Sequence, residues 1–128
     1  KRIFIVENVS NEYWCGILKK SSLGICFYKP SILSHKHMAG TSQKFNNYLA
    51  SNIPMIVNDN KDFLRFKRKF DIYETTNPSR PVNIASCINN IFLKKKRYFM
   101  IKKNMRYAFK KKLNFENQFD QSYHKFLL

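Results

Sequence analysis

Residues 40–58 of the chain read GTSQKFNNYLASNIPMIVN, and this stretch carries the clearest local signals in the sequence. Thr41 or Ser42 can accept hydrogen bonds from the first free amide groups of a helix. Asn52 falls where that helix must end, in the left-handed position that asparagine tolerates best after glycine. Pro54 opens a short apolar run, which is typical of a buried strand. We therefore expect a capped helix followed by a buried strand, and the helix has an apolar stripe formed by Phe45, Tyr48 and Leu49.

The other segments continue this alternation of strands and helices. Apolar runs predict strands at 3–6, 23–28, 55–57 and 71–73. Amphipathic patterns predict further helices at 10–20, 59–70, 81–92, 98–112 and from residue 114 onward. The loop over 29–40 is longer than most connections, which favours a functional role for it. Strands that alternate with helices predict an α/β domain with three layers around a parallel sheet.

Size and composition restrict the class of protein. The 128 residues suffice for one small domain or a piece of a larger one, and 44% hydrophobic content supplies a core. Because a strand is predicted almost directly after Lys1, we expect a piece of a longer polypeptide. No apolar run approaches the roughly 18 residues of a membrane span. The three cysteines are widely spaced, which is typical of reduced thiols in the cytoplasm.

The formal net charge of +16 has two interpretations. It indicates an anionic partner, or it reflects a composition that is rich in lysine throughout. Basic residues cluster at 94–97 and 110–112, next to the aromatic side chains of Tyr98, Phe99 and Tyr107. A solvated helix face is the first interpretation of these clusters, an anionic membrane surface the second and nucleic acid the third.

The order of parts in residues 40–58 resembles a signature of the C-terminal domains of GT-B-type glycosyltransferases of the group 1-like kind. That signature runs Ser/Thr-x-Lys-x-x-Glu-Tyr-Leu-Ala-x-Gly-x-Pro and continues into a β-branched strand. Asn47 replaces its glutamate and Asn52 its glycine, of which the second is the milder change because both residues accept a positive φ. The matching residues are Ser42, Lys44, Tyr48, Leu49, Ala50 and Pro54.

The resemblance implies a Rossmann-like, donor-binding part of a GT-B fold that is incomplete at its N-terminus. Residues 1–112 would form the partial nucleotide-sugar-binding domain, and 113–128 a C-terminal helix that crosses to an absent N-terminal domain. The implied activity is a hexosyltransferase-type transfer of sugar from a nucleotide-diphosphate-sugar to an acceptor hydroxyl in surface polysaccharide synthesis. The donor is a substrate, no cofactor is implied, and the acceptor is a glycan or a lipid-linked molecule. We expect a cytoplasmic protein, peripheral to the inner face of the membrane.

By resemblance, the donor diphosphate lies against Thr41 and Ser42 at the N-terminus of the predicted helix, where free amide groups and the helix dipole favour anions. Lys44 would add positive charge. Asn47 takes the place of a glutamate that holds the donor ribose, and Ala39 replaces a second glutamate eight residues earlier. Three explanations stay open: the ribose is held differently, the branch is divergent, or activity is lost. No catalytic residue is assigned, because the family's catalytic base lies in the N-terminal domain.

Two alternatives to a glycosyltransferase remain. One is a basic α/β module that binds nucleic acid, and the other is a non-catalytic relative that serves as a scaffold. His35 and His37 in the long loop could bind a metal, but no acidic or thiol ligand adjoins them in sequence, so we expect no metal site.

Overall fold

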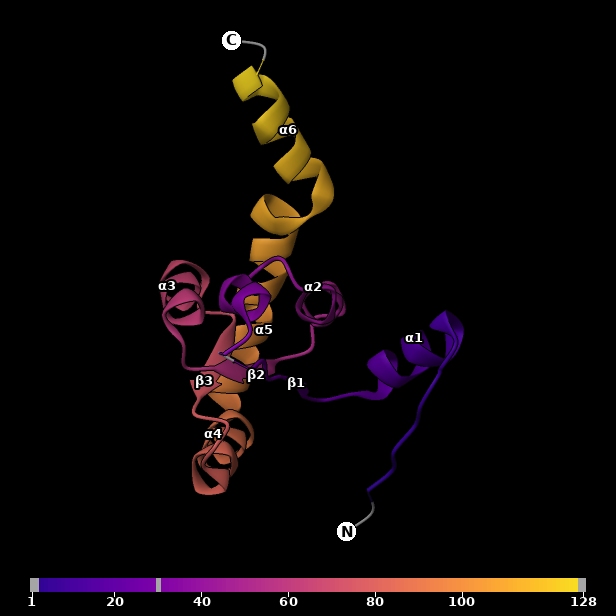
Figure 1. The fold of residues 1–128 in the computed structure, drawn as a ribbon, viewed down its shortest axis with the longest axis vertical. Coiled ribbons are helices and arrows are strands. Elements are labelled where there is room, and N and C mark those ends of the chain that lie inside the picture. The colour runs from indigo at the N-terminus through magenta and orange to yellow at the C-terminus, as the bar shows by residue number, and fades with distance from the viewer. Residues whose placement is uncertain (1–2, 30, 127–128) are drawn as a thin grey trace.

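The structure is a computed structural model that describes residues 3–29 and 31–126, with side chains described up to Tyr123. Figure 1 shows a small parallel sheet surrounded by helices. The α-helices are α1 (Asn11–Lys20), α2 (Gln43–Ala50), α3 (Lys61–Phe70), α4 (Pro81–Leu93), α5 (Lys95–Ala108) and α6 (Phe115–Phe126). Two shorter elements are the 3₁₀ helix η1 (Leu33–His37) and the π-helical turn η2 (Phe109–Leu113).

The sheet has three parallel strands in the order β1 (Gly24–Cys26), β2 (Met55–Asn58) and β3 (Tyr73–Thr76). β2 is the central strand, and all four of its residues are buried. Helices α2 and α3 lie on one side of the sheet and α4 on the other (Figure 1). The predicted α/β class with a parallel sheet is therefore confirmed, and the arrangement is compatible with a Rossmann-like fold.

The buried core joins the sheet to α2 and α3, and it continues to Ile91 of α4 and Met105 of α5. Phe45, Phe63 and Tyr73 are fully buried there, and their ring centroids lie 5.8–6.2 Å apart. The Tyr73 hydroxyl donates to the Phe63 carbonyl oxygen at 2.6 Å, which satisfies a polar group that burial would otherwise penalise. Burial raises the pKa of Tyr73. These rings join one face of the sheet to both helices.

The stretch 40–58 folds as its local signals predict. The Ser42 hydroxyl accepts from the Phe45 amide at the start of α2. Asn52 adopts a φ of 55°, the left-handed conformation expected after the helix. A Cβ atom on Gly24 would lie 2.5 Å from the ring of Tyr48, so β1 and α2 pack closely only because glycine occupies that position.

Asn52 also does more than a glycine could. With its amide oriented to match its neighbours, the side chain donates to the Lys102 carbonyl oxygen and accepts from Arg106 Nε, both at 2.8 Å. The residue that replaces the signature's glycine therefore stops the helix and ties the α2–β2 turn to α5.

Two strand predictions need correction. Residues 3–6 form no strand; their side chains are between 51% and 88% exposed, because no neighbouring strand in the described structure pairs with them. The third strand begins at Tyr73, rather than covering 71–73, because Asp71 adopts a left-handed φ of 47° as the C-cap of α3. An apolar run predicts a strand, but a ladder partner decides whether one forms.

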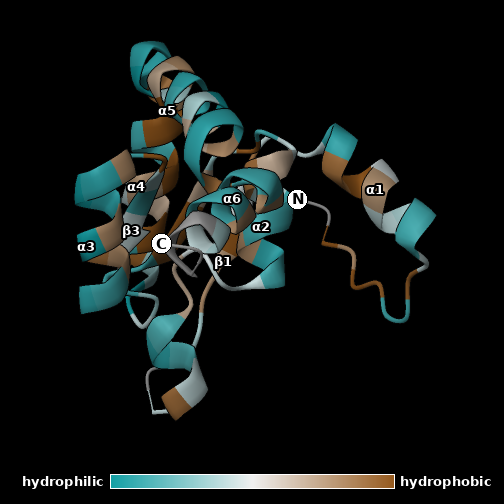
Figure 2. Ribbon diagram, turned by 90° about the horizontal axis from the view of Figure 1, so that it is seen from above, coloured by the Kyte–Doolittle hydropathy of each residue, from teal (hydrophilic) through white to brown (hydrophobic). Residues whose placement is uncertain are grey.

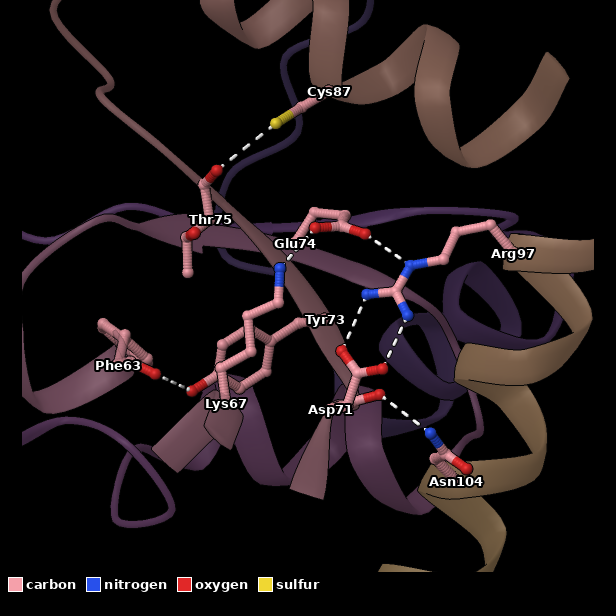
Figure 3. A network of polar contacts seen from close by, with 9 residues as sticks. All are labelled: Phe63, Lys67, Asp71, Tyr73, Glu74, Thr75, Cys87, Arg97 and Asn104. Carbon is pink, nitrogen blue, oxygen red and sulfur yellow. Dashed lines mark hydrogen bonds and ion pairs between the residues drawn. The ribbon is translucent and has the colours of Figure 1, made fainter. Parts of the chain in front are cut away.

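Helix α5 crosses the amino edge of the sheet, where it contacts the turns that precede β2 and β3. Arg97 donates to both carboxylate oxygens of Asp71, at 2.6 and 2.8 Å, and also to Glu74 (Figure 3). Lys67 pairs with Glu74, and Asn104 donates to the Asp71 carbonyl oxygen at 3.2 Å. Arg97 was expected in an exposed basic cluster; it is instead part-buried and neutralised.

The two ends of the chain extend from this body. Figure 2 shows that α1 and the segment before it stand apart from the sheet and carry several hydrophobic residues. Helix α6 projects from the end of α5 and η2 (Figure 1). Within the described residues, no helix is both long enough and apolar enough to cross a membrane. The predicted crossing of 113–128 to another domain stays a prediction, and residues 127–128 lie outside the described part.

Candidate functional site at the carboxyl edge of the sheet

The carboxyl ends of the strands meet opposite α5, and this edge is where open α/β sheets bind ligands. Asn58, at the end of β2, holds the end of β1 through two hydrogen bonds. Its Oδ1 accepts from the Tyr28 amide at 2.7 Å, and its Nδ2 donates to the Tyr28 carbonyl oxygen at 3.0 Å. The two strands are thereby fixed side by side beyond their last ladder pair, so the edge has a defined shape.

The N-terminus of α2 lies at this edge. Ser42 is 9% exposed, and its hydroxyl contacts the Tyr28 hydroxyl as well as the Phe45 amide. The Ser42 hydroxyl therefore already makes its hydrogen bonds within the protein. The amide groups of Gln43 and Lys44 have no hydrogen-bond partner among the described residues. These two amides, rather than the Ser42 hydroxyl, are the donors that α2 can offer to an anion.

The other predicted donor-binding residues have different environments. Thr41 is exposed, and its hydroxyl donates to the His37 carbonyl oxygen at 2.6 Å. Lys44 and Asn47 are three residues apart on one face of α2, Lys44 exposed and Asn47 half-buried. The Asn47 side chain makes no hydrogen bond within the described structure. Lys44 and Asn47 are thus available to a ligand, whereas Thr41 and Ser42 contribute mainly to the local structure.

Cys26 and Tyr28 lie beside this helix end. Burial raises the pKa of the Cys26 thiol to about 11, an effect that the charge of Lys44 partly offsets. Burial also raises the pKa of Tyr28 to about 12. Burial thus favours the neutral form of both groups.

The loop between η1 and α2 is fixed against α3. Gly40 has a φ of 80°, and a Cβ atom there would meet the Phe66 ring at 3.0 Å. The Ala39 amide donates to Asp62 Oδ2 at 3.0 Å. Asp62 therefore places a carboxylate beside the backbone of Ala39.

Sequence reasoning missed a hollow between η1 and the outer face of α3. Its volume is about 680 Å³, and none of the predicted donor-binding residues lines it. A local signal was present, because Lys61, Arg65 and Arg68 recur at helical spacing opposite the apolar face of α3. The hollow is lined by Lys36, His37, Asn60, Lys61, Asp62, Leu64, Arg65 and Arg68.

The two loop histidines are not brought together with other ligands. The His35 ring makes an edge-to-face contact with Tyr28, with centroids 5.6 Å apart, and its Nδ1 is buried without a partner within the described structure. His37 lines the hollow. No group of three or more metal-ligating side chains occurs in the described ranges 3–29 and 31–126.

Comparisons with protein-family models, with curated proteins and with solved structures find no match for this chain. The geometry and chemistry of the carboxyl edge must therefore support any functional assignment.

Proposed function

We propose that this chain is the donor-binding part of a glycosyltransferase of the GT-B type, which binds a nucleotide-diphosphate-sugar at the N-terminus of α2. Transfer would join the donor's anomeric carbon to an acceptor hydroxyl and release the nucleoside diphosphate. The free amide groups of Gln43 and Lys44 would stabilise the charge of that leaving group.

One observation carries the proposal: in the stretch that resembles the donor-binding signature, the helix end at Ser42 lies at the carboxyl edge of a parallel sheet. Its signature positions have clear structural roles, with Tyr48 against Gly24, Leu49 in the core and Asn52 at the helix stop. The positions that the fold does not use, Lys44 and Asn47, are those that a ligand could contact.

The residues at the N-terminus of α2 support donor binding more strongly than catalysis. Asn47 offers one acceptor oxygen and an amide donor where the signature has a carboxylate, so a ribose would be held by fewer accepted hydrogen bonds. Ala39 supplies no side chain for catalysis, and Asp62 is already bound to the Ala39 amide and to Arg65. A non-catalytic relative that still binds the donor is therefore the alternative within the same class.

The test is a thermal unfolding experiment on the intact chain with uridine, guanosine and adenosine diphosphate sugars. A ligand that binds only the folded state at 100 times its Kd adds about 2.7 kcal/mol of stability, so at least one donor should raise the Tm by several degrees. Lys44→Glu should weaken that binding at least tenfold. Because a carboxylate near a helix N-terminus is favourable, this variant should keep its fold.

Lys20→Glu is the matched control, since Lys20 is exposed on α1 and the change in net charge is identical. Donor binding should survive in this control. The proposal fails if no nucleotide-sugar shifts the Tm, or if both variants lose binding equally.

A second candidate is a module that binds nucleic acid. The observation in its favour is the exposed cluster 110–112 in η2, near the exposed ring of Tyr107. The pairing of Arg97 with Asp71 and Glu74 counts against the other cluster. RNA or DNA binding whose affinity falls steeply with salt, together with no response to nucleotide-sugars, would favour this candidate.

A further inference from the structure

The hollow between η1 and α3 has the dimensions of a small-molecule site. Its volume of about 680 Å³ lies in the usual range for ligand pockets. One wall is the outer face of the first two turns of α3, and the other is formed by Lys36 and His37 at the end of η1. Most of the surface that lines the hollow is apolar, and Leu64, 39% exposed, contributes to it beside the charged side chains.

The charges around the hollow are not balanced. Four cationic side chains line it, and Asp62 is the one carboxylate among the lining residues. That carboxylate is already engaged, because Oδ1 accepts from Arg65 at 3.2 Å and Oδ2 from the Ala39 amide. Of the four cations that line the hollow, Lys36, Lys61 and Arg68 have no acidic partner within the described structure.

This arrangement costs the free protein stability. Lys61 and Arg65 are four residues apart on α3, a spacing at which like charges repel, although Arg65 also pairs with Asp62. Lys61 is the first residue of α3, where the helix dipole disfavours a cation, whereas Arg68 lies in the last turn, where a cation is favoured. The Arg65 side chain is 79% exposed, so water surrounds most of it. A bound anion would reduce the repulsion between Lys61 and Arg65, and it would interact favourably with the dipole at the N-terminus of α3.

The walls of the hollow are held in place before any ligand binds. The Ala39 amide is bonded to Asp62, and Gly40 packs on Phe66, so the loop after η1 is anchored to α3 at two points. The Thr41 hydroxyl fixes the His37 carbonyl oxygen at 2.6 Å. A site with preformed walls loses less conformational entropy when it binds.

We infer that this hollow is a second anion site, which binds a compact ligand with at least two adjacent phosphate groups. Lys61 and Arg68 on one wall and Lys36 on the other surround the phosphate oxygens, and Arg68 can make a bidentate contact. A hollow between two walls suits a small molecule better than a nucleic acid strand or a lipid surface, which need an extended face. The inference does not rest on glycosyl transfer or on the α2 site.

The experiment is isothermal titration of the intact chain with inorganic pyrophosphate and tripolyphosphate. The measurements use a Lys44→Glu background, so that any binding at the N-terminus of α2 is suppressed. The double variant Lys61→Gln/Arg68→Gln should weaken pyrophosphate binding at least tenfold. The control double variant Lys19→Gln/Lys20→Gln, on the exposed end of α1, removes the same charge and should change binding less than twofold.

Circular dichroism melting of each variant checks that it is folded. The inference is overturned if neither polyphosphate binds, or if both double variants lose affinity equally, which would indicate a bulk charge effect. It is also overturned if anionic vesicles or RNA bind through Lys61 and Arg68 while pyrophosphate does not. Loss of nucleotide-sugar binding alone would leave it intact.

Discussion

The two edges of the sheet carry opposite arrangements of charge. At the amino edge, Arg97 is neutralised by Asp71 and Glu74, and the cluster joins α5 to β3 (Figure 3). The outer face of α3, which begins at the carboxyl edge, presents cations such as Lys61 and Arg68 that have no acidic partner in the described structure. Charge that is neutralised internally supports the fold, whereas charge in excess lowers stability and is available to a ligand. The comparison separates basic residues that support the fold from basic residues that have no structural partner.

The largest effect is expected from Arg97→Ala. The change leaves the carboxylates of Asp71 and Glu74 without their main partner and removes three hydrogen bonds to charged groups. Because Asp71 is 41% exposed, water compensates in part, and we expect a loss of about 2–3 kcal/mol in the free energy of unfolding. Urea denaturation measures it. Lys95→Ala, an exposed change on the same helix, should stay within about 0.5 kcal/mol, and an equal loss in both would contradict the structural role of Arg97.

Gly40→Ala tests the backbone of the carboxyl edge. A side chain at a φ of 80° costs roughly 1–2 kcal/mol, and the new Cβ would press on the Phe66 ring. Gly16→Ala is the matched control, since nothing lies within 4 Å of its Cβ position in α1. The control should raise stability by roughly 0.5–1 kcal/mol, because alanine is the better helix former. Differential scanning calorimetry of both variants would refute the account if their effects had the same sign.

The pH dependence of stability gives a second test of the amino edge. Hydrogen bonds from Arg97 hold the pKa of Asp71 below its ordinary value of 3.8. The folded pKa is thus lower than the unfolded one, and the stabilisation is complete above the unfolded value and lost as pH falls through the folded value. Between ~pH 5 and ~pH 3, the wild type should therefore lose more stability than Arg97→Ala. Equal acid sensitivity in urea denaturation would show that the pair does not stabilise the fold.

The smallest effect is expected at the unpaired cations. Lys61→Gln and Arg68→Gln should each change the free energy of unfolding by less than about 0.5 kcal/mol, because the exposed charges have no partner to lose. Relief of repulsion on α3 would make the sign favourable. A loss of more than about 1 kcal/mol in urea denaturation would mean that these residues support the fold.

Local chemistry made much of the fold predictable. Ser42, Asn52 and Pro54 each act through their own residue type, as a cap, a left-handed stop and the start of a strand. The strand expected at 3–6 failed because pairing depends on a partner that an apolar run cannot reveal. The amino-edge cluster was missed for a related reason, since Arg97 and Asp71 are 26 residues apart.

The candidate site was predictable only in part. The sequence predicted the helix end at Ser42. Only the structure shows that the Ser42 hydroxyl contacts the Tyr28 hydroxyl and the Phe45 amide. The hollow requires Lys36 on η1 to face Arg68 on α3, and no local pattern places two such elements together. The charge run on α3 was visible, but its lack of acidic partners depends on every neighbouring element.

The most direct test of the difference between the edges is a ¹H–¹⁵N correlation spectrum of the intact chain, recorded during titration with inorganic pyrophosphate. The account predicts that the shifted amides lie in 36–44 and 60–65, at the carboxyl edge. The amides of Asn52, Asp71 and Asn104 at the amino edge should stay unchanged. Shifts concentrated at the amino edge, or no shift at all at millimolar pyrophosphate, would contradict the claim that the carboxyl edge is the anion-binding side of the molecule.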